Sequence, residues 1–372
     1  MKICVGLRDD APPNLRQDNL RSEGRWERQV LEACLQNPHV SEVFTTGSVW
    51  KGNSPKYRGS ITESAASSAI LLNQDWNTSV VNKYRYKAVI TNLFAGPWPE
   101  QTEEVKSTYR NLNGNLFFTL GFPVMHRQEV VDRNPYSGMV YLEKFIPRSN
   151  IILLPVPGAP YVSNESNFER KNLVWAQRLI FMSQLEESAT LLWSLKMLEK
   201  DSSIHLDILT GWKRNEVKNL IDGQVVFRES IVDDFWNLGK FSPLRHLKDR
   251  VNIYLELSWE EVIDKYSKAK LFTTYGRAFG GPPIESGMHG IPFVASGNTG
   301  ALCDCPNYLY VSSDPYTNNK ELEACDTLEK LLTDRELYTK IGNSYRDYVR
   351  DNYTYEAFNR NLNKILSDRA LL

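Results

Sequence analysis

The chain of 372 residues has few of the features that mark membrane-spanning or nucleic-acid-coating proteins. Its apolar runs all fall well short of the roughly 20 residues that a membrane helix needs. Lys and Arg number 44 against 45 Asp and Glu, which gives a formal net charge of -1. A protein that coats nucleic acid needs a basic excess, so we expect no nucleic-acid partner. One local basic stretch, NKYRYK at 82–87, stands out, and peripheral contact with a membrane stays open.

Cysteine is also scarce and lacks the spacing of a metal site. The five cysteines include one C-x-C pair, Cys303 and Cys305, with His289 as the nearest histidine in sequence. A zinc site there is one alternative, and reduced thiols of a cytosolic protein are the better one. The N-terminal MKICVGLRDD has an apolar run too short for a signal peptide. We therefore expect a cytoplasmic protein that holds no metal.

The first half alternates strand-like and helix-like segments. KICVGL (2–7) predicts a buried strand, and apolar residues at helical spacing follow it up to Pro38. SEVFTT (41–46) then predicts a second strand. Strand, helix and strand together form a crossover unit of a parallel sheet. Further strands are expected at 87–94 and 115–120, with a helix at 100–112, and 150–162 is expected to be a last strand that runs into proline- and glycine-rich chain. The stretch 156–170 has the composition of a linker with little to bury, so we expect a domain boundary there.

The second half restarts the same alternation. Ser258 and Glu261 form a capping-box pattern that predicts a helix at 259–269. Strands are expected at 172–178, 205–211, 251–257, 270–275 and 292–296, and further helices at 184–199, near 283–290, and at 319–333, 335–350 and 354–367. No repeat is visible, so two open α/β sheets are the expected fold class.

The chemistry is expected in the turn TTYGRAFGGPPIESGMHGIPFVASG at 273–297. Glycines there let the backbone approach a ligand, and Pro282 and Pro283 suit a helix start. Amides near 279–281 would face a diphosphate, and Glu285 in the first helical turn would accept hydrogen bonds from two ribose hydroxyls. The alternative is an ordinary strand-to-helix turn in which Glu285 is only a charge that stabilises the helix start.

At this turn the chain resembles the retaining GT-B glycosyltransferases of the group 1 family, which use nucleotide-sugars. Their pattern Glu-Gly-Phe-Gly-Leu-Pro-x-x-Glu, then a small-residue helix, Gly-x-Pro and a strand, is similar to RAFGGPPIESGMHGIPFVAS. The resemblance covers about 170–370 clearly and 1–165 weakly. It implies a GT-B architecture of two Rossmann-like domains that face each other across a cleft. The expected parts are an acceptor domain at 1–160, a donor domain at 170–352, and a closing helix at 353–372 that returns to the first domain.

The resemblance also implies roles for single residues. Glu285 matches the glutamate that holds the ribose, and Arg178 matches a phosphate-binding arginine, although it is equally well an ordinary surface arginine at a strand end. Gly24 resembles the glycine that approaches the diphosphate from the other domain. The turn that contacts phosphate and sugar corresponds to Phe279, Gly280 and Gly281.

The acceptor should bind the first half. His126 is the candidate for the family's histidine near the donor sugar, although a structural histidine explains it better. The aromatic stretch NLFAGPWPE (92–100) follows a strand and suits stacking on a sugar, and core packing explains it almost as well.

Three departures from the family pattern concern the donor. Arg277 stands where the family has a sugar-contacting glutamate, and Ala278 replaces the next glycine. The expected lysine after the phosphate arginine is absent, with Ser183 or Gln184 near its place. A second cation for the diphosphate must then come from Arg277 or Lys213.

The sequence thus predicts a glycosyltransferase that moves a sugar from a nucleotide diphosphate donor to an acceptor hydroxyl with retention of configuration. Arg277 and His126 are the catalytic candidates. The donor is expected to be a UDP- or GDP-sugar, the acceptor a glycan, a lipid-linked molecule or a protein, and no metal cofactor is expected. Two alternatives remain: an epimerase of the same architecture that hydrolyses its donor, and a catalytically weakened nucleotide-sugar-binding partner of an active transferase.

Overall fold

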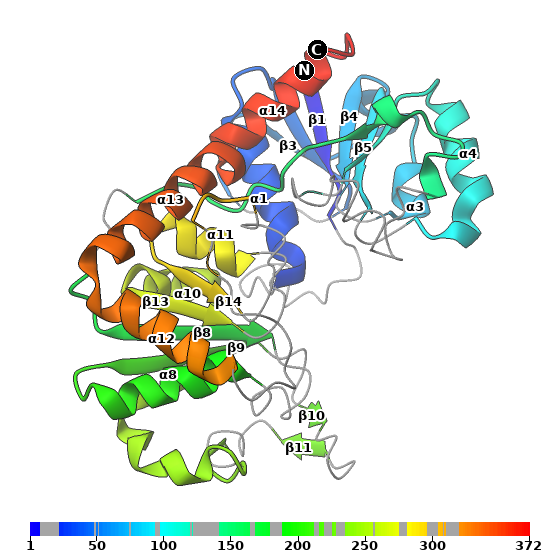
Figure 1. The fold of residues 1–372 in the computed structure, drawn as a ribbon. Helices are drawn as coiled ribbons and strands as arrows, with labels where there is room; N and C mark the ends of the chain where they lie inside the picture. The colour runs from blue at the N-terminus through cyan, green and yellow to red at the C-terminus, as the bar shows by residue number, and fades with distance from the viewer. Residues whose placement is uncertain are drawn as a thin grey trace. The chain divides into compact units, whose positions relative to one another are not determined.

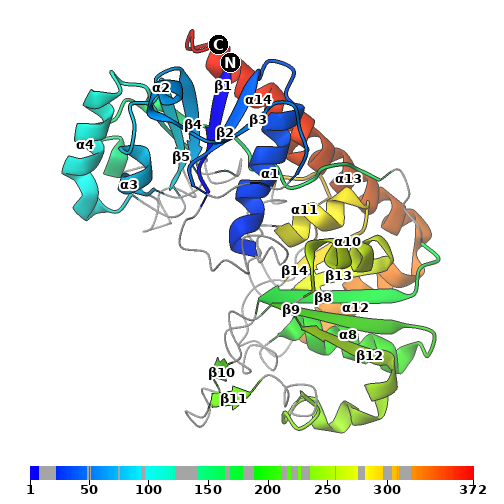
Figure 2. The ribbon, with the colours of Figure 1, turned by 180° about the vertical axis from the view of Figure 1, so that it is seen from behind.

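The computed structural model contains two compact units, each built on its own parallel sheet (Figures 1 and 2). The first unit joins Met1–Tyr161 to Asp351–Leu372, and the second is Val162–Arg350. The structure describes residues 1–7, 22–47, 50, 52–73, 76–93, 97–119, 121, 141–163, 168–178, 188–211, 216–218, 225–227, 235–255, 257–274, 281–295, 304–307, 309 and 320–372.

The first unit holds a seven-stranded sheet in the order β3-β2-β1-β4-β5-β6-β7, and all its strand pairs are parallel. In the central strands every residue of β4 and β5 is buried, as expected for a sheet covered on both faces. The strands are β1 (Lys2–Val5), β2 (Glu42–Thr45), β3 (Tyr57–Ser60), β4 (Ala69–Asn73), β5 (Ala88–Asn92), β6 (Leu116–Thr119) and β7 (Ile151–Ile152).

Helices cover both faces of this sheet. Helix α1 (Ser22–Gln36) and the C-terminal helix α14 (Tyr355–Ser367) lie together on one face, with α3 (Thr78–Val81) and α4 (Thr102–Asn111) on the other (Figures 1 and 2). Val30, Phe358 and Leu362 share a buried core with Ile3 and Ile70 of the sheet. The remaining short elements are α2 (Glu63–Ala66) and the 3-10 helices η2 (Pro99–Gln101) and η4 (Arg148–Asn150).

The stretch after β7 differs from the expectation in two ways. The strand expected at 150–162 ends after two residues, because Pro155 and Pro157 have no N–H to donate to a ladder. Of the expected linker, residues 156–159 are buried, whereas Tyr161 is 50% exposed, and the two units divide between Tyr161 and Val162, inside the predicted stretch 156–170. Gly158 N donates to the carbonyl oxygen of Tyr353 at 2.9 Å, and Ala159 forms a parallel bridge with Thr354. The extended chain therefore pairs with the segment that leads into α14.

The second unit holds a five-stranded parallel sheet in the order β12-β9-β8-β13-β14. Its strands are β8 (Asn172–Arg178), β9 (His205–Gly211), β12 (Val251–Leu255), β13 (Ala269–Thr274) and β14 (Phe293–Ala295). A separate antiparallel pair joins β10 (Glu216–Lys218) to β11 (Val225–Phe227). Two separate sheets confirm the predicted fold class.

The connections between the parallel strands place helices on both faces of the second sheet (Figures 1 and 2). Helix α8 (Ala189–Lys200) packs against α12 (Lys320–Thr333), whereas α10 (Trp259–Ser267) packs against α11 (Gly281–Met288). The predicted capping box begins α10, since Ser258 Oγ accepts from Glu261 N at 3.2 Å. The 3-10 helix η6 (Ser242–Arg250) precedes β12, and α13 (Arg335–Tyr353) runs from the second unit into the first.

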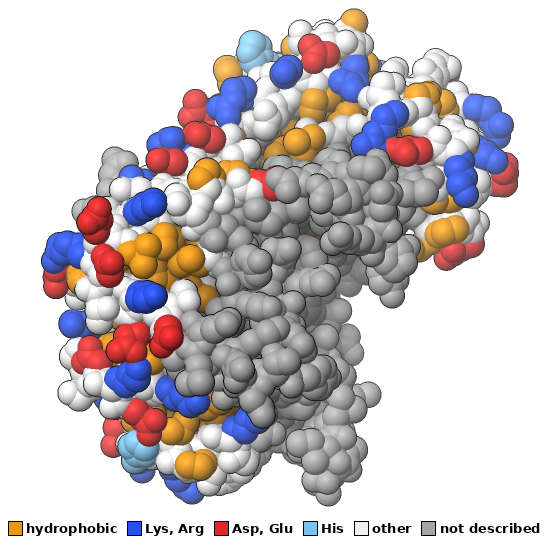
Figure 3. All heavy atoms as spheres, in the orientation of Figure 1, with side chains coloured by type: hydrophobic (Ala, Val, Ile, Leu, Met, Phe, Trp, Pro, Cys, Tyr) orange, Lys and Arg blue, Asp and Glu red, His pale blue; other side chains and the backbone are white. Residues whose placement is uncertain are grey.

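The exposed surface agrees with the balanced charge. On the face shown in Figure 3, basic and acidic side chains are interspersed over the outer helices of the second unit. Within the described ranges no helix combines the length and the apolar character that crossing a membrane requires. Cys4, Cys34 and Cys305 are buried free thiols, and Cys303 lies outside the described residues.

Candidate functional site

The strand order of the second unit marks one edge of its sheet as the expected ligand site. From β8 the chain moves outward through β9 to β12, and then returns to the opposite side of β8 as β13. The order therefore reverses between β8 and β13, which pair in parallel. In open α/β sheets ligands bind beyond the carboxyl ends of the strands at such a reversal. Those ends are Arg178 and Thr274.

A buried hydroxyl network fixes the two strand ends to the start of α8. Thr190 Oγ1 donates to the carbonyl oxygen of Thr274 at 2.7 Å, and Thr274 Oγ1 donates to that of Ala176 at 2.7 Å. Ser188 caps α8 and accepts from the indole of Trp175 at 3.0 Å. Because all these groups are buried, their hydrogen bonds hold this edge of the sheet rigidly.

Helix α11 follows β13 and contains two of the predicted donor-site residues, Gly281 and Glu285. It begins at Gly281, and Pro282 and Pro283 come next. The first four N–H groups of a helix have no partner within it, but prolines have none to offer. In α11 only Gly281 and Ile284 supply amides there. Any diphosphate at this helix start therefore needs positive side chains in addition to the helix dipole.

Glu285 is placed differently from the expectation. It is the fifth residue of α11 and lies in the second turn instead of the first. Its side chain is only 1% exposed, whereas the sequence led us to expect a carboxylate that opens onto a ligand site. It shares this burial with the rest of the helix from Pro283 to Met288. A ligand can reach this carboxylate only if it displaces what covers it.

Helix α11 packs closely against α13 at Gly287. A Cβ added at Gly287 would lie 2.4 Å from Val349 Cγ2 and 3.0 Å from the carbonyl oxygen of Tyr345. The glycine therefore allows the two helices to approach closely. Tyr345 also donates its hydroxyl to the carbonyl oxygen of Phe293 in β14 at 3.1 Å. Helix α11 is thus held between α13 and the sheet.

His289, one turn after Glu285, was considered in the sequence only as a zinc ligand. It is 3% exposed, and burial lowers its pKa to about 4, with the positive charge of Arg170 adding to the effect. The imidazole is therefore neutral near pH 7. Within the described residues, no group of three or more His, Cys, Asp or Glu side chains is placed to hold a metal ion.

The first sheet has a corresponding reversal between β1 and β4. Gly6 follows β1 and donates its N–H to the carbonyl oxygen of Leu72 at 2.8 Å. A Cβ at Gly6 would lie 2.1 Å from Asn73 Oδ1, so any other residue here would require the Asn73 side chain to move. Gly24, expected in the loop after β1, lies instead in the first turn of α1. A helix start next to a strand reversal remains suited to an anion.

The structure brings three of the predicted residues to one edge of the second sheet. Arg178 ends β8, although its side chain is outside the described part, and Gly281 and Glu285 belong to the helix after β13. The other predicted residues of the site lie outside the described residues: Arg277, Phe279, Gly280, Lys213 and His126. Of the stretch 92–100, Trp98 is described and is 42% exposed, so core packing does not account for it.

Solved structures similar to this chain support its fold, whereas comparisons of its sequence find no related family or protein. No family model matches the chain, and no curated protein matches it. A glycosyltransferase from Rickettsia africae has a TM-score of 0.60 at 12% identity, covering 98% of each chain. Sucrose-phosphate synthase from Thermosynechococcus elongatus has a TM-score of 0.57 at 14% identity, covering 100% of this chain and 99% of that one.

A third similar structure contains a ligand. HepE from Anabaena, solved with UDP and glucose, has a TM-score of 0.53 at 10% identity and covers 98% of this chain and 99% of its own. Other similar chains are longer, and this chain spans 57% of the first of them. Together these neighbours show that the chain has the GT-B fold of two Rossmann-like units.

Proposed function

We propose that this protein is a glycosyltransferase that moves a sugar from a nucleotide diphosphate sugar, most simply a UDP-sugar, to an acceptor hydroxyl with retention of configuration. The observation that carries the proposal is Glu285 in α11, directly beyond β13, where the order of the second sheet reverses. The GT-B fold and the HepE structure with UDP and glucose support it. Retention rests on the resemblance of the turn at 277–296 to the retaining family.

In this proposal Glu285 accepts hydrogen bonds from both ribose hydroxyls, and the start of α11 faces the diphosphate. Because prolines leave that helix start with few N–H groups, Arg178, Arg277 and Lys213 are the proposed sources of positive charge. Preorganised charge at the departing diphosphate lowers the barrier without a covalent intermediate on the protein. We assign no general base, because the leaving phosphate itself can take the proton of the acceptor.

The burial of Glu285 adds a kinetic expectation. Since the carboxylate is 1% exposed, nucleotide binding must be accompanied by a rearrangement of the chain around α11. Association that requires a conformational change falls below the usual range of about 10⁵–10⁷ M⁻¹s⁻¹. Stopped-flow mixing with UDP should then show a rate that reaches a plateau as the nucleotide concentration rises.

A donor screen and product analysis test the proposal. UDP-, GDP-, ADP- and dTDP-sugars are compared for the rise in melting temperature that they cause, with and without EDTA, since metal-independent binding is proposed. The donor that binds is then incubated with simple glycoside acceptors, and NMR reads the anomeric configuration of the product. Donor turnover to an isomerised free sugar without acceptor would favour the epimerase. Binding without any turnover would favour the inactive partner.

Arg277 gives a sharper test of the donor, because it stands where the resembling family has a carboxylate. We propose that its guanidinium meets phosphate or an acidic donor sugar. Arg277→Ala should weaken donor binding about 10-fold or more, corresponding to one lost charged hydrogen bond. Comparing UDP-glucose with UDP-glucuronate locates the contact, since a larger loss for glucuronate assigns it to the sugar. Unchanged affinity and turnover would mean that the side chain is only solvated.

A further inference from the structure

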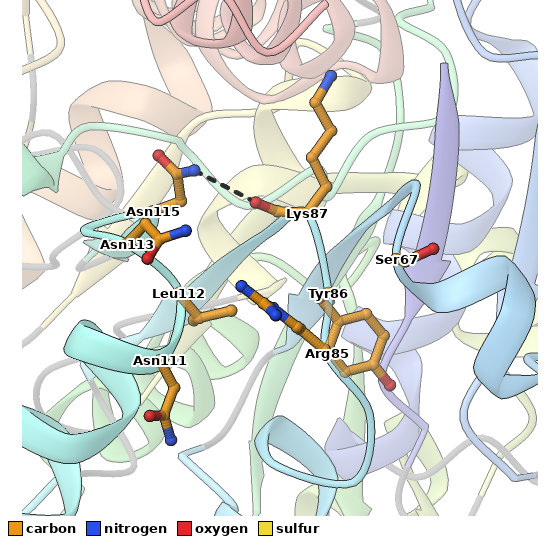
Figure 4. Close-up of a pocket in the computed structure, with 8 residues that line it drawn as sticks. All are labelled: Ser67, Arg85, Tyr86, Lys87, Asn111, Leu112, Asn113 and Asn115. Carbon is orange, nitrogen blue, oxygen red and sulfur yellow. Dashed lines mark hydrogen bonds between the residues drawn. The ribbon is translucent and has the colours of Figure 1, made fainter.

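A hollow lies at the edge of the first sheet where its strands begin, opposite to their carboxyl ends (Figure 4). Its volume is about 190 Å³, which is below the roughly 300 Å³ of pockets for drug-sized ligands and suits a single sugar ring. Three segments line it, each just before a strand: Ser67 before β4, Arg85 to Lys87 before β5, and Asn111 to Asn115 before β6. The hollow therefore opens at the amino ends of these strands.

The charges that line the hollow are positive. Arg85 and Lys87 belong to the basic stretch at 82–87, and no carboxylate is among the lining residues. Lys87 Nζ donates to the carbonyl oxygen of Leu371 at 2.7 Å and in Figure 4 points away from the other lining side chains. The exposed guanidinium of Arg85 has no hydrogen bond or ion pair with any residue that the structure describes. In Figure 4 it points toward the turn of Leu112 and Asn113. Arg85 is thus the cation available to a ligand.

Asparagine side chains provide the neutral hydrogen-bonding groups. Asn113 has a φ of 52°, and Gly114 has a φ of 84°, so the chain turns sharply here in the left-handed region. Asn115 Nδ2 donates to the carbonyl oxygen of Lys87 at 3.4 Å. The amides of Asn111 and Asn113 make no hydrogen bond within the described part of the chain. Each amide offers two donors and an acceptor, which suits adjacent hydroxyl groups.

A purely structural role for Arg85 is capping the end of α4, which terminates at Asn111. Basic side chains often bond to the last carbonyl oxygens of a helix. Here three of the last four carbonyls are already bonded: Thr108 O accepts from Leu112 N at 3.0 Å, and Tyr109 O accepts from Gly114 N at 2.9 Å. Arg110 O accepts from Asn113 N at 3.0 Å. Most of the helix end is therefore satisfied without the guanidinium.

We propose that this hollow binds a compact polyhydroxylated anion of about one sugar's size, either a sugar phosphate or a sugar acid. Arg85 would bind the anionic group in a bidentate manner, and the amides of Asn111 and Asn113 would bind hydroxyls. The five residues of β4 separate the hollow from the carboxyl edge by about 16 Å at the usual rise per residue. Such a ligand would therefore bind the first unit without competing with a ligand at the carboxyl ends of β1 and β4.

The test uses the full chain and four probes: glucose 6-phosphate, glucuronate, inorganic phosphate and glucose. Isothermal titration should show saturable binding of glucose 6-phosphate or glucuronate, weak binding of phosphate and none of glucose. Arg85→Gln should weaken the binding at least 10-fold. Asn113→Gly should weaken the binding to a smaller extent, and glycine readily adopts the left-handed backbone of this position. Arg58→Gln, which removes another exposed arginine, one paired with Glu42 in β2, is the control for loss of a surface arginine and should bind as the wild type does.

Two further measurements separate this site from the proposed nucleotide site. Binding of the sugar anion should be unchanged in Glu285→Gln and in the presence of saturating UDP. Melting temperatures of all variants establish that they are folded before affinities are compared. The proposal is overturned if neither sugar anion saturates below about 10 mM, a very weak affinity. It is equally overturned if Arg85→Gln and Asn113→Gly bind as tightly as the wild type, or if UDP displaces the ligand.

Discussion

Glu285 can contribute either to nucleotide binding or only to the stability of α11, and the two roles give different outcomes. Glu285→Gln keeps the shape of the side chain and removes its charge. Hydrogen bonds to a charged group contribute roughly 1.5–3 kcal/mol, so the loss of the ribose contact should weaken UDP binding about 10- to 100-fold. Isothermal titration with UDP measures this change, and the melting temperature measures stability separately.

The burial of Glu285 makes the second measurement necessary. A side chain that is 1% exposed is part of the packed interior, so the substitution is expected to change the melting temperature as well. Glu336→Gln, in the first turn of α13, is the control for loss of a charge at a helix start, which should cost about 0.3–1 kcal/mol. A lower melting temperature of Glu285→Gln with unchanged UDP affinity would contradict the ribose contact.

His289 gives a prediction about pH. Its pKa is about 4 in the folded chain against a usual 6.5, chiefly because the side chain is buried. Between these values the unfolded chain binds the proton and the folded chain does not, so stability is full above pH 6.5 and falls as the pH drops toward 4. The loss approaches about 3 kcal/mol at its largest. Urea unfolding of wild type and His289→Gln from pH 7 to 4 tests this, since the glutamine variant should lack this part of the decline.

At the scale of elements, sequence periodicity predicted strands better where flanking turns were clear. The strand predicted at 172–178 is confirmed residue for residue, because a polar stretch and a loop frame seven residues of strand character. By contrast, β4 at the centre of the first sheet was missed, although all five of its residues are buried. Its apolar run is short and lies among serine and asparagine residues, so no local signal separates it from a loop.

The glycines and prolines of the turn predicted helix α11, but they did not predict which side chains pack around it. Which side chains a helix meets depends on contacts between residues distant in sequence, here Val349 and Tyr345 of α13. A glycine that permits close helix packing looks the same in sequence as one in a turn. The burial of Glu285 and the lowered pKa of His289 likewise depend on what surrounds the folded helix, and no local pattern of residues reports that.

The close approach of α11 and α13 predicts the effect of a single methyl group. Gly287→Ala should destabilise the second unit by about 1–3 kcal/mol, because its Cβ would lie 2.4 Å from Val349 Cγ2. Val349→Ala removes that contact and costs stability by leaving a cavity. The double variant should be more stable than the sum of the two losses predicts, as denaturant unfolding of all four chains will measure. Strict additivity would show that the alanine at 287 does not press on Val349.

At the scale of the whole molecule, the alternation of strands and helices predicted two sheets, and the resemblance added the closing helix that returns to the first domain. In the structure Phe358, Leu362 and Leu366 of α14 are part of the core of the first unit. Asn359 Nδ2 also donates to the carbonyl oxygen of Ala33 in α1 at 2.7 Å. Periodicity shows only that 354–367 is amphipathic, and it cannot tell which core receives the apolar face.

The shared core predicts how fragments of the chain will fold. Residues 1–161 alone lack α14, so they should expose the apolar face of α1 and fail to unfold cooperatively. A chain that joins 1–161 to 351–372 should fold, because Ala159 and Thr354 are bridge partners and a linker of about eight Gly and Ser residues spans the ends. Circular dichroism during heating measures how cooperatively each of the two chains unfolds. Binding of an apolar dye measures the apolar surface that each exposes. As a control for linker and length, Leu362→Asp in the joined chain should behave like 1–161. A cooperative, dye-free transition of 1–161 by itself would show that α14 is dispensable to the first core.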